Sequence, residues 1–117
     1  MATYTKEKLS ASTNGRGIKI SATASAGTTV HQTGTANKDE VWLYAYNSAA
    51  TPQLITVQFG GTTSIDDDIK LTIPSQSGLT LVVPGLTLVP SGSALTVAVY
   101  AATTNVVTIQ GYVNRIA

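Results

Sequence analysis

Short stretches of alternating apolar and polar residues recur along this chain, and they constrain its fold more than any other feature. From residue 15 onward, about eight or nine such stretches follow one another at intervals of roughly 8 to 12 residues. Gly, Pro, Asn and Ser separate them, and no segment has the period of about 3.6 residues that marks an amphipathic helix. The pattern predicts an all-β antiparallel β-sandwich, jelly-roll-like. An immunoglobulin-like sandwich is the nearest alternative, although the Cys, Trp, Cys framework of antibody domains is absent.

The alternation also predicts where the strands lie. We expect them over residues 16–22, 29–33, 41–47, 53–59, 69–73, 79–83, 86–88, 95–100 and 107–114. Pro84-Gly85 has the chemistry of a type II turn, because proline presets the first central position and glycine accepts positive φ at the second. The stretch 79–88 is therefore expected to turn at Pro84.

The 117 residues suffice for one domain but leave no room for two. Residues 1–14 are polar and hold only Tyr4 and Leu9 as large apolar groups, so they are expected to form an N-terminal arm. Such a segment is either a frayed end or an arm that becomes ordered on a partner. Residues 15–117 are expected to form a single β-sandwich domain.

The stretch from Val41 to Asn47 is unusual because both of its faces need cover. Val41, Leu43 and Ala45 point to one side, and Trp42, Tyr44 and Tyr46 point to the other. The first set is too small to anchor a core alone, so we expect Trp42 to turn at least partly inward. Tyr44 and Tyr46 are expected to face outward at a subunit contact. By the same alternation, two tyrosines on later strands face outward and would extend this patch if their strands lie next to it: Tyr100 and Tyr112.

Charge and cysteine content exclude several classes of function. Only 11% of residues are charged and the net charge is +1, so the chain lacks the clustered basic surface that binds nucleic acid. With no cysteine, it has no disulfide or thiolate metal site. The start of the sequence lacks the features of a signal peptide, and no apolar run approaches about 18 residues. We expect a soluble protein made in the cytosol that has no membrane partner.

No pattern in the sequence predicts an enzyme or a cofactor. His31 is the only histidine, and it lies among threonines on a short strand, where a solvent-facing or merely hydrogen-bonded role is expected. A nucleophile elbow of the form Gly-x-Ser-x-Gly is absent, and so is a phosphate-binding P-loop. A glycosidase would need two carboxylates across a cleft, for which Glu7, Glu40 and the cluster Asp66–Asp68 are the only sources.

The run Asp66-Asp67-Asp68 is the strongest local polar feature. Its carboxylates could contribute to a calcium site, but neighbouring side chains on an extended chain alternate, so at most Asp66 and Asp68 converge. The closing glutamate and the spacing of an EF-hand are missing. The expected role is a solvated turn that keeps a strand end from pairing, and no metal site is assigned.

Three sequence stretches resemble structural proteins of tailed bacteriophages. They are Val-Trp-Leu-Tyr-Ala-Tyr-Asn from residue 41, Leu-Val-Val-Pro-Gly-Leu-Thr-Leu at 81–88 and Val-Thr-Ile-Gln-Gly-Tyr-Val-Asn-Arg-Ile at 107–116. Over roughly the last two-thirds of its length the chain is similar to head decoration, or cement, proteins. Such proteins sit on the outside of the capsid, often as trimers, and hold neighbouring capsomers together. The resemblance carries no catalytic residue.

The resemblance implies a virion protein that is assembled in the host cytoplasm and lies on the capsid surface. Its partners would be other copies of itself, as a homotrimer, and the major capsid protein. For the subunit contact we assign Tyr44, Tyr46, Tyr100 and Tyr112, and for the capsid contact Tyr4, Lys6, Lys8 and Leu9. The alternative is a carbohydrate-binding or receptor-binding module of a tail appendage, in which aromatic rings stack on sugars.

Overall fold

The computed structural model describes residues 3–117, and within them the chain forms nine β-strands. Most of them lie at or near the predicted stretches, but the predicted strands 79–83 and 86–88 form a single strand, and a strand lies within residues 1–14, where none is predicted. The strands are β1 (Tyr4–Lys8), β2 (Ile18–Lys19), β3 (Thr28–Gln32), β4 (Lys38–Asn47), β5 (Gln53–Phe59), β6 (Asp68–Ile73), β7 (Thr80–Leu88), β8 (Thr96–Ala101) and β9 (Val107–Ile116).

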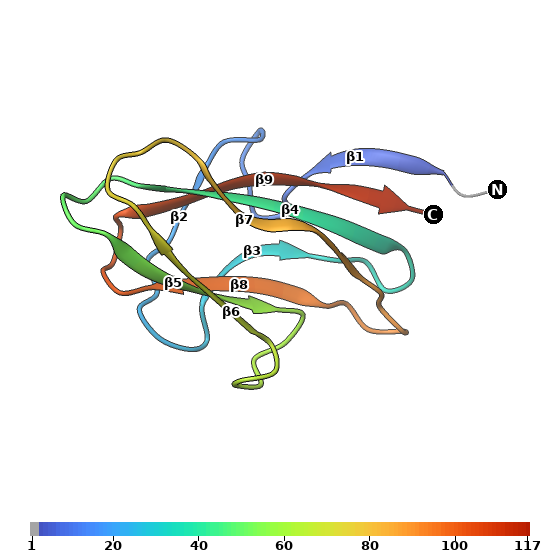
Figure 1. Cartoon of the computed structure of the whole chain (residues 1–117). Coiled ribbons are helices and arrows are strands. Elements are labelled where there is room, and N and C mark those ends of the chain that lie inside the picture. The colour runs from blue at the N-terminus through green and yellow to red at the C-terminus, as the bar shows by residue number, and fades with distance from the viewer. Residues whose placement is uncertain (1–2) are drawn as a thin grey trace.

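The strands form two antiparallel sheets that pack face to face (Figure 1). Sheet A has the order β1-β9-β4-β7, and the short β2 also pairs with β9. Sheet B has the order β3-β8-β5-β6. The predicted all-β antiparallel sandwich is confirmed.

The pairings are nested along the sequence. β5 pairs with β6, β4 with β7, β3 with β8, and β1 with β9, so each pair encloses the previous one. Successive pairs alternate between the two sheets. The chain is thus arranged like one long hairpin that has been wrapped around a shared core.

The core lies between the sheets and is built from alternate residues of the central strands. On β4, Val41, Leu43 and Ala45 are fully buried. The expectation that Trp42 turns inward is wrong: it alternates with these residues and lies on the outer face, partly exposed. The small inward residues of β4 suffice because sheet B contributes larger branched side chains to the same core, among them Ile55 and Val57.

The N-terminal arm expected over residues 1–14 is not confirmed. Residues 4–8 form β1, which pairs along its whole length with β9, and Leu9 is 1% exposed within the core. Thr3 and Ala117 also exchange backbone hydrogen bonds of 3.0 and 2.9 Å. The sequence signal was weak because β1 is an edge strand with mostly exposed side chains. Residues 1–2 lie outside the described part.

Strand β7 continues through Pro84-Gly85, so the predicted type II turn is wrong. Val41 is opposite Leu86 while the next residue, Trp42, is opposite Pro84, which leaves Gly85 as an extra residue in a β-bulge. β7 is the edge of sheet A, where a proline without an N–H is tolerated. Gly85 has φ +77°, and an added Cβ would lie 2.7 Å from Cζ2 of Trp42. The bulge therefore makes room for the tryptophan ring.

Replacing Gly85 with alanine tests this contact, with Gly78→Ala as the matched control. Both glycines have nearly equal positive φ, +77° and +76°, but only Gly85 lies against a side chain. We expect Gly78→Ala to lower the free energy of unfolding by about 1–2 kcal/mol through backbone strain. Gly85→Ala should cost about 1–3 kcal/mol more, because the added methyl group displaces Trp42. Urea denaturation measures both, and equal losses would contradict the contact.

Candidate functional site

The outer face of sheet A carries a group of aromatic side chains on its two central strands. Trp42, Tyr44 and Tyr46 come from β4, and Tyr112 comes from β9, directly opposite Trp42. All four are partly exposed. We call these four residues the aromatic face. It exists because β4 and β9 are neighbours in the sheet and because both strands alternate without interruption here.

Trp42 is held in a defined position on this face. Its ring stacks on that of Tyr112, with centroids 6.2 Å apart and planes at 14°. Its Nε1–H donates to Oε1 of Glu40 at 2.7 Å, and Asn114 donates to the same oxygen at 3.0 Å. These hydrogen bonds favour the ionised carboxylate and lower the pKa of Glu40. On the other side of the stack, Nζ of Lys6 lies 4.3 Å from the centroid of the Tyr112 ring.

A face of this kind suits binding to a flat surface. Aromatic rings contribute much apolar area, and their polar tips keep hydrogen-bonding capacity at the edge of a contact. The rings of Trp42 and Tyr112 stack on each other, so these two side chains have little conformational entropy left to lose on binding. Both a protein surface and the apolar side of a sugar ring meet these conditions.

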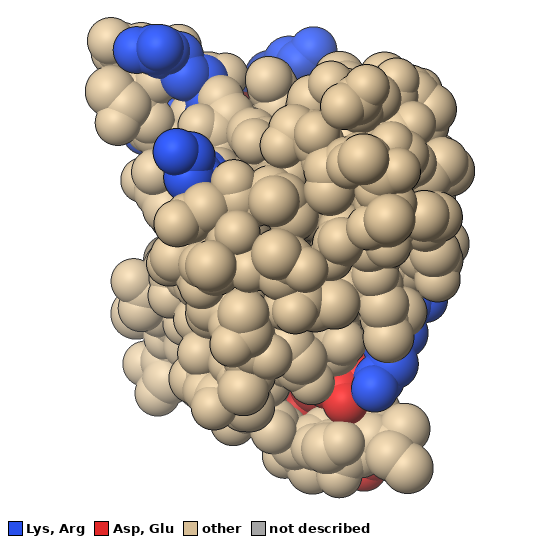
Figure 2. Space-filling model, turned by 90° about the vertical axis from the view of Figure 1, so that its left-hand side faces the viewer, with Lys and Arg blue, Asp and Glu red and all other residues tan. Residues whose placement is uncertain are grey.

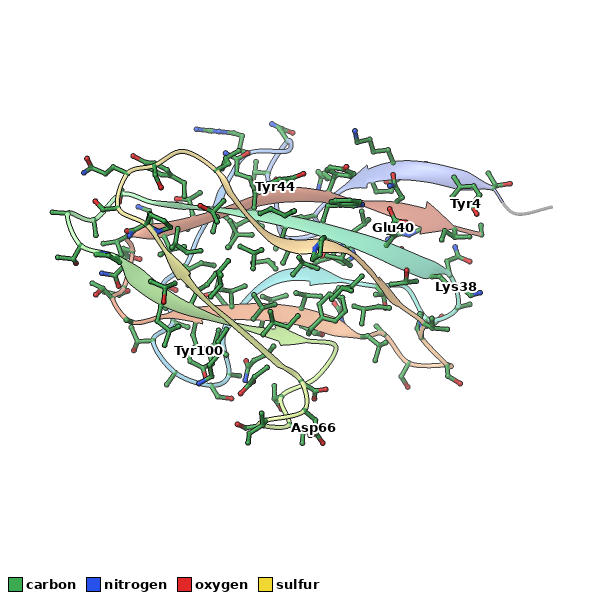
Figure 3. The ribbon with its side chains drawn as sticks, viewed as in Figure 1. Tyr4, Lys38, Glu40, Tyr44, Asp66 and Tyr100 are labelled. Carbon is green, nitrogen blue, oxygen red and sulfur yellow. The ribbon has the colours of Figure 1, made fainter. Side chains whose placement is uncertain are left out.

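Tyr100 does not belong to the aromatic face. It lies on β8 in sheet B, opposite Thr56 of β5, and Figure 3 shows it on the side of the molecule away from Tyr44. The expected single patch of tyrosines is therefore wrong for Tyr100, because β8 neighbours β3 and β5 and not β4. Tyr112 does extend the patch, because β9 pairs with β4 along its whole length.

Of the four residues assigned to a capsid contact, three are exposed and one is buried. Tyr4 is 69% exposed (Figure 3). Lys6 and Lys8 are also exposed, on β1 at the edge of sheet A. Leu9 is buried in the core, so its assignment to a contact surface is wrong. The three exposed residues lie at one edge of the sheet that carries the aromatic face.

A buried polar group, missed by the sequence analysis, joins the two sheets. Asp39 of β4 accepts a hydrogen bond from His31 Nε2 of β3 at 2.7 Å, and both residues are buried. Arg115 of β9 donates to the two oxygens of Asp39 from Nε at 2.9 Å and from a terminal nitrogen at 3.1 Å. His31 Nδ1 in turn accepts from the backbone N–H of Ser10 at 3.1 Å, which leaves the ring proton on Nε2. A signal existed, since alternation on β4 places Asp39 on the inner side with Val41.

The electrostatics of this group favour an ionised carboxylate. Burial raises the pKa of Asp39, but the hydrogen bonds from Arg115 and His31, together with the positive charge of Arg115, outweigh burial, so the pKa is lowered. The same ion pair raises the pKa of Arg115. The hydrogen-bonding atoms of His31 are all used within the chain and closed to solvent. The expected solvent-facing position of His31 is wrong, and the expected hydrogen-bonded role is confirmed.

The aspartate cluster braces its own loop. Oδ2 of Asp67 accepts from the Thr63 N–H at 3.0 Å, and Oδ2 of Asp68 accepts from Ser64 Oγ at 3.1 Å. Asp66 is exposed. Among residues 3–117, no group of three or more His, Cys, Asp and Glu side chains is placed to hold a metal ion.

Comparison of the chain with protein-family models and with curated protein sequences finds no match. The part of the chain that the structure describes contains no helix long and apolar enough to cross a membrane.

Replacing Asp39 with asparagine tests the buried group. At neutral pH we expect a loss of about 3–5 kcal/mol in the free energy of unfolding, because Arg115 and His31 lose their charged acceptor. The pKa of Asp39 is lowered in the folded protein, so its stabilisation is present above the unfolded pKa of about 3.9 and disappears as pH falls through the folded pKa. The difference between wild type and variant should therefore shrink below about pH 4.

Thermal denaturation at several pH values measures this difference. Asp66→Asn is the matched control, because it changes an exposed carboxylate and should cost no more than about 0.5 kcal/mol. A difference in stability between wild type and Asp39→Asn that stays constant down to about pH 2.5 would contradict the role given to the carboxylate.

Proposed function

We propose that this chain is a head decoration protein of a tailed bacteriophage, which binds the outside of the capsid as a homotrimer and stabilises the shell. One observation carries the proposal. The three stretches that resemble decoration proteins, 41–47, 81–88 and 107–116, lie on three adjacent strands, β4, β7 and β9. Segments far apart in sequence thus build one continuous surface, which includes the aromatic face. If the resemblance came from composition alone, the three stretches would not be expected to lie side by side on one surface.

The strand arrangement supports the same proposal. We propose that the nested pairing of β1 with β9, β3 with β8, β4 with β7 and β5 with β6 is a jelly roll. Jelly rolls occur in viral capsid proteins and also in lectins and cupins. The fold therefore suits a virion protein but does not select it, and the surface must carry the functional argument.

The proposed mechanism is adhesion by many contacts. The aromatic face would bind another copy, since self-association buries apolar area and is favoured by Trp and Tyr anchors. The exposed edge of β1, with Tyr4, Lys6 and Lys8, would bind the major capsid protein. Three linked copies engage several capsomers at once, so contacts that are weak singly become strong together. In this role the protein is assembled in the host cytoplasm, resides on the capsid surface, and needs no cofactor and no catalytic step.

A second candidate, a carbohydrate-binding or receptor-binding module, is favoured by the position of Trp42. The ring is partly exposed on the outer face and lies parallel to Tyr112. Glu40 and Asn114 place polar groups beside it, as sugar hydroxyls require. Such a module would hold a bacterial polysaccharide by stacking and hydrogen bonding.

The decoration hypothesis predicts self-association and capsid binding. Light scattering of the purified protein should give the mass of a trimer, and the protein should cosediment with expanded phage capsids. Replacing Tyr44 and Tyr46 together with serine should weaken self-association at least about tenfold, because the apolar contact area is lost. Tyr100→Ser on sheet B is the matched control and should leave it unchanged. A monomer that binds no capsid would disprove the hypothesis.

The carbohydrate hypothesis predicts a change in the fluorescence of Trp42, the single tryptophan, when bacterial polysaccharide is added. Trp42→Ala should abolish binding measured by calorimetry, because stacking is lost, whereas Tyr100→Ala should not affect it. Unchanged fluorescence across a panel of host surface polysaccharides would exclude this second candidate.

A further inference from the structure

The loop between β5 and β6 projects an apolar residue into solvent beside three carboxylates. Ile65 is 79% exposed, more than any other large hydrophobic residue in the described part of the chain. It immediately precedes Asp66, which Figure 3 shows at the extremity of the loop, away from both sheets. We call Ile65–Asp68 the acidic tip.

The acidic tip has a fixed shape. Backbone N–H groups of Asp67 and Asp68 donate to the carbonyls of Thr63 and Ile65 at 2.9 and 3.0 Å. The side chains of Asp67 and Asp68 add their own hydrogen bonds to Thr63 and Ser64. Asp66 makes no such bond within residues 3–117 and is exposed. A braced loop that displays Ile65 next to a free carboxylate is organised for a partner, since little flexibility remains to be lost.

A hollow of about 560 Å³ lies on the outer side of sheet A. Its floor is formed by Thr108 and Gln110 of β9, and its wall by the segment from Ala11 to Ile18. Gly17 allows this wall to approach, because a Cβ there would collide with Thr108. The hollow has the size of sites that hold small ligands, about 300–1,000 Å³. Ala11 gives it a small apolar part, and Arg16 gives it a positive charge.

The hollow adjoins the aromatic face. Thr108 and Gln110 are the cross-strand partners of Tyr46 and Tyr44, so the floor of the hollow and the tyrosines share one outer surface. A partner that enters the hollow would therefore also meet the aromatic face.

Tip and hollow are complementary in charge. Four basic residues lie on the segments around the hollow and on the neighbouring edge strand: Arg16, Lys19, Lys6 and Lys8. Within the described residues, none of the four forms a salt bridge. The tip carries three of the six acidic residues of the chain. Figure 2 shows one end of the molecule, where several basic side chains lie at the top and upper left, and the visible acidic atoms lie in the lower part, next to one basic group.

We propose that the acidic tip of one copy docks into the hollow of a second copy, with Ile65 against Ala11 and Asp66 paired with Arg16. The tip follows β5 of sheet B, whereas the hollow lies on the outer face of sheet A, so a copy cannot fill its own hollow. Each copy gives a tip and receives one. Such a heterologous contact repeats around an axis and can close into a ring. This inference rests on the self-association in the proposed function, and it specifies which surfaces of the two copies meet.

The test is charge reversal on each side, followed by both changes in one chain. Asp66→Arg and Arg16→Asp should each weaken self-association at least about tenfold, as measured by sedimentation velocity, because each places like charges together. The variant with both changes should recover association, because every contact then has opposite charges again. Asp66 takes no part in the bracing of the loop, so its reversal should leave the fold intact, which circular dichroism checks.

Ile65→Ser tests the apolar part, with Val89→Ser as the matched control. Val89 is also exposed, at 58%, but lies outside the acidic tip and the hollow. We expect at least about a tenfold loss of association for Ile65→Ser and no change for Val89→Ser.

Three outcomes would overturn the inference: a wild-type protein that stays monomeric at high micromolar concentration, association that is unaffected by Ile65→Ser, or a folded double variant that does not reassociate. Capsid cosedimentation separates this inference from the proposed function. Association through the tip without capsid binding disproves the decoration role alone. If a trimer binds capsids and its self-association is unchanged by these substitutions, only the docking is disproved.

Discussion

The carboxylate of Asp39 is the point at which three strands from both sheets meet. It accepts hydrogen bonds from His31 on β3 in sheet B and from Arg115 on β9 in sheet A. Because an unpaired buried charge is costly, folding favours the arrangement in which Asp39 meets both His31 and Arg115. His31 also holds the backbone of Ser10, which fixes the segment after β1. The strands that carry the aromatic face and the wall of the hollow are therefore positioned by one polar group.

The fold could be predicted from the sequence wherever strands are long and alternate, because burial of one face determines the pattern. The alternation predicts a strand over residues 53–59, and β5 lies at Gln53–Phe59. Where another interaction determines the local structure, the alternation of apolar and polar residues predicts it wrongly. β1 has almost no apolar residues because it is an edge strand, and β7 continues through Pro84 because a bulge, and not a turn, absorbs Gly85.

The candidate site was predictable in part for a related reason. The direction of Tyr44, Tyr46 and Tyr112 follows from alternation within each strand, which is a local property. Whether those side chains meet depends on which strands are neighbours, which is not local, and so Tyr100 was wrongly grouped with them. The partners Asp39 and Arg115 are 76 residues apart, and no period in the sequence relates them. Trp42 was misplaced because the volume supplied by sheet B was not visible from β4 alone.

The bulge in β7 has a consequence for solubility. β7 is an open sheet edge with Leu81 and Leu86 exposed, and the chain has no charged residue between Lys70 and Arg115, so the lysines that usually protect such edges are missing. Protection comes instead from shape: Pro84 offers no N–H, and the extra Gly85 breaks the regular spacing that a foreign strand would need. Charge-based protection weakens as salt screens it, whereas steric protection does not. The protection that Pro84 and Gly85 give to this edge should therefore not depend on the salt concentration.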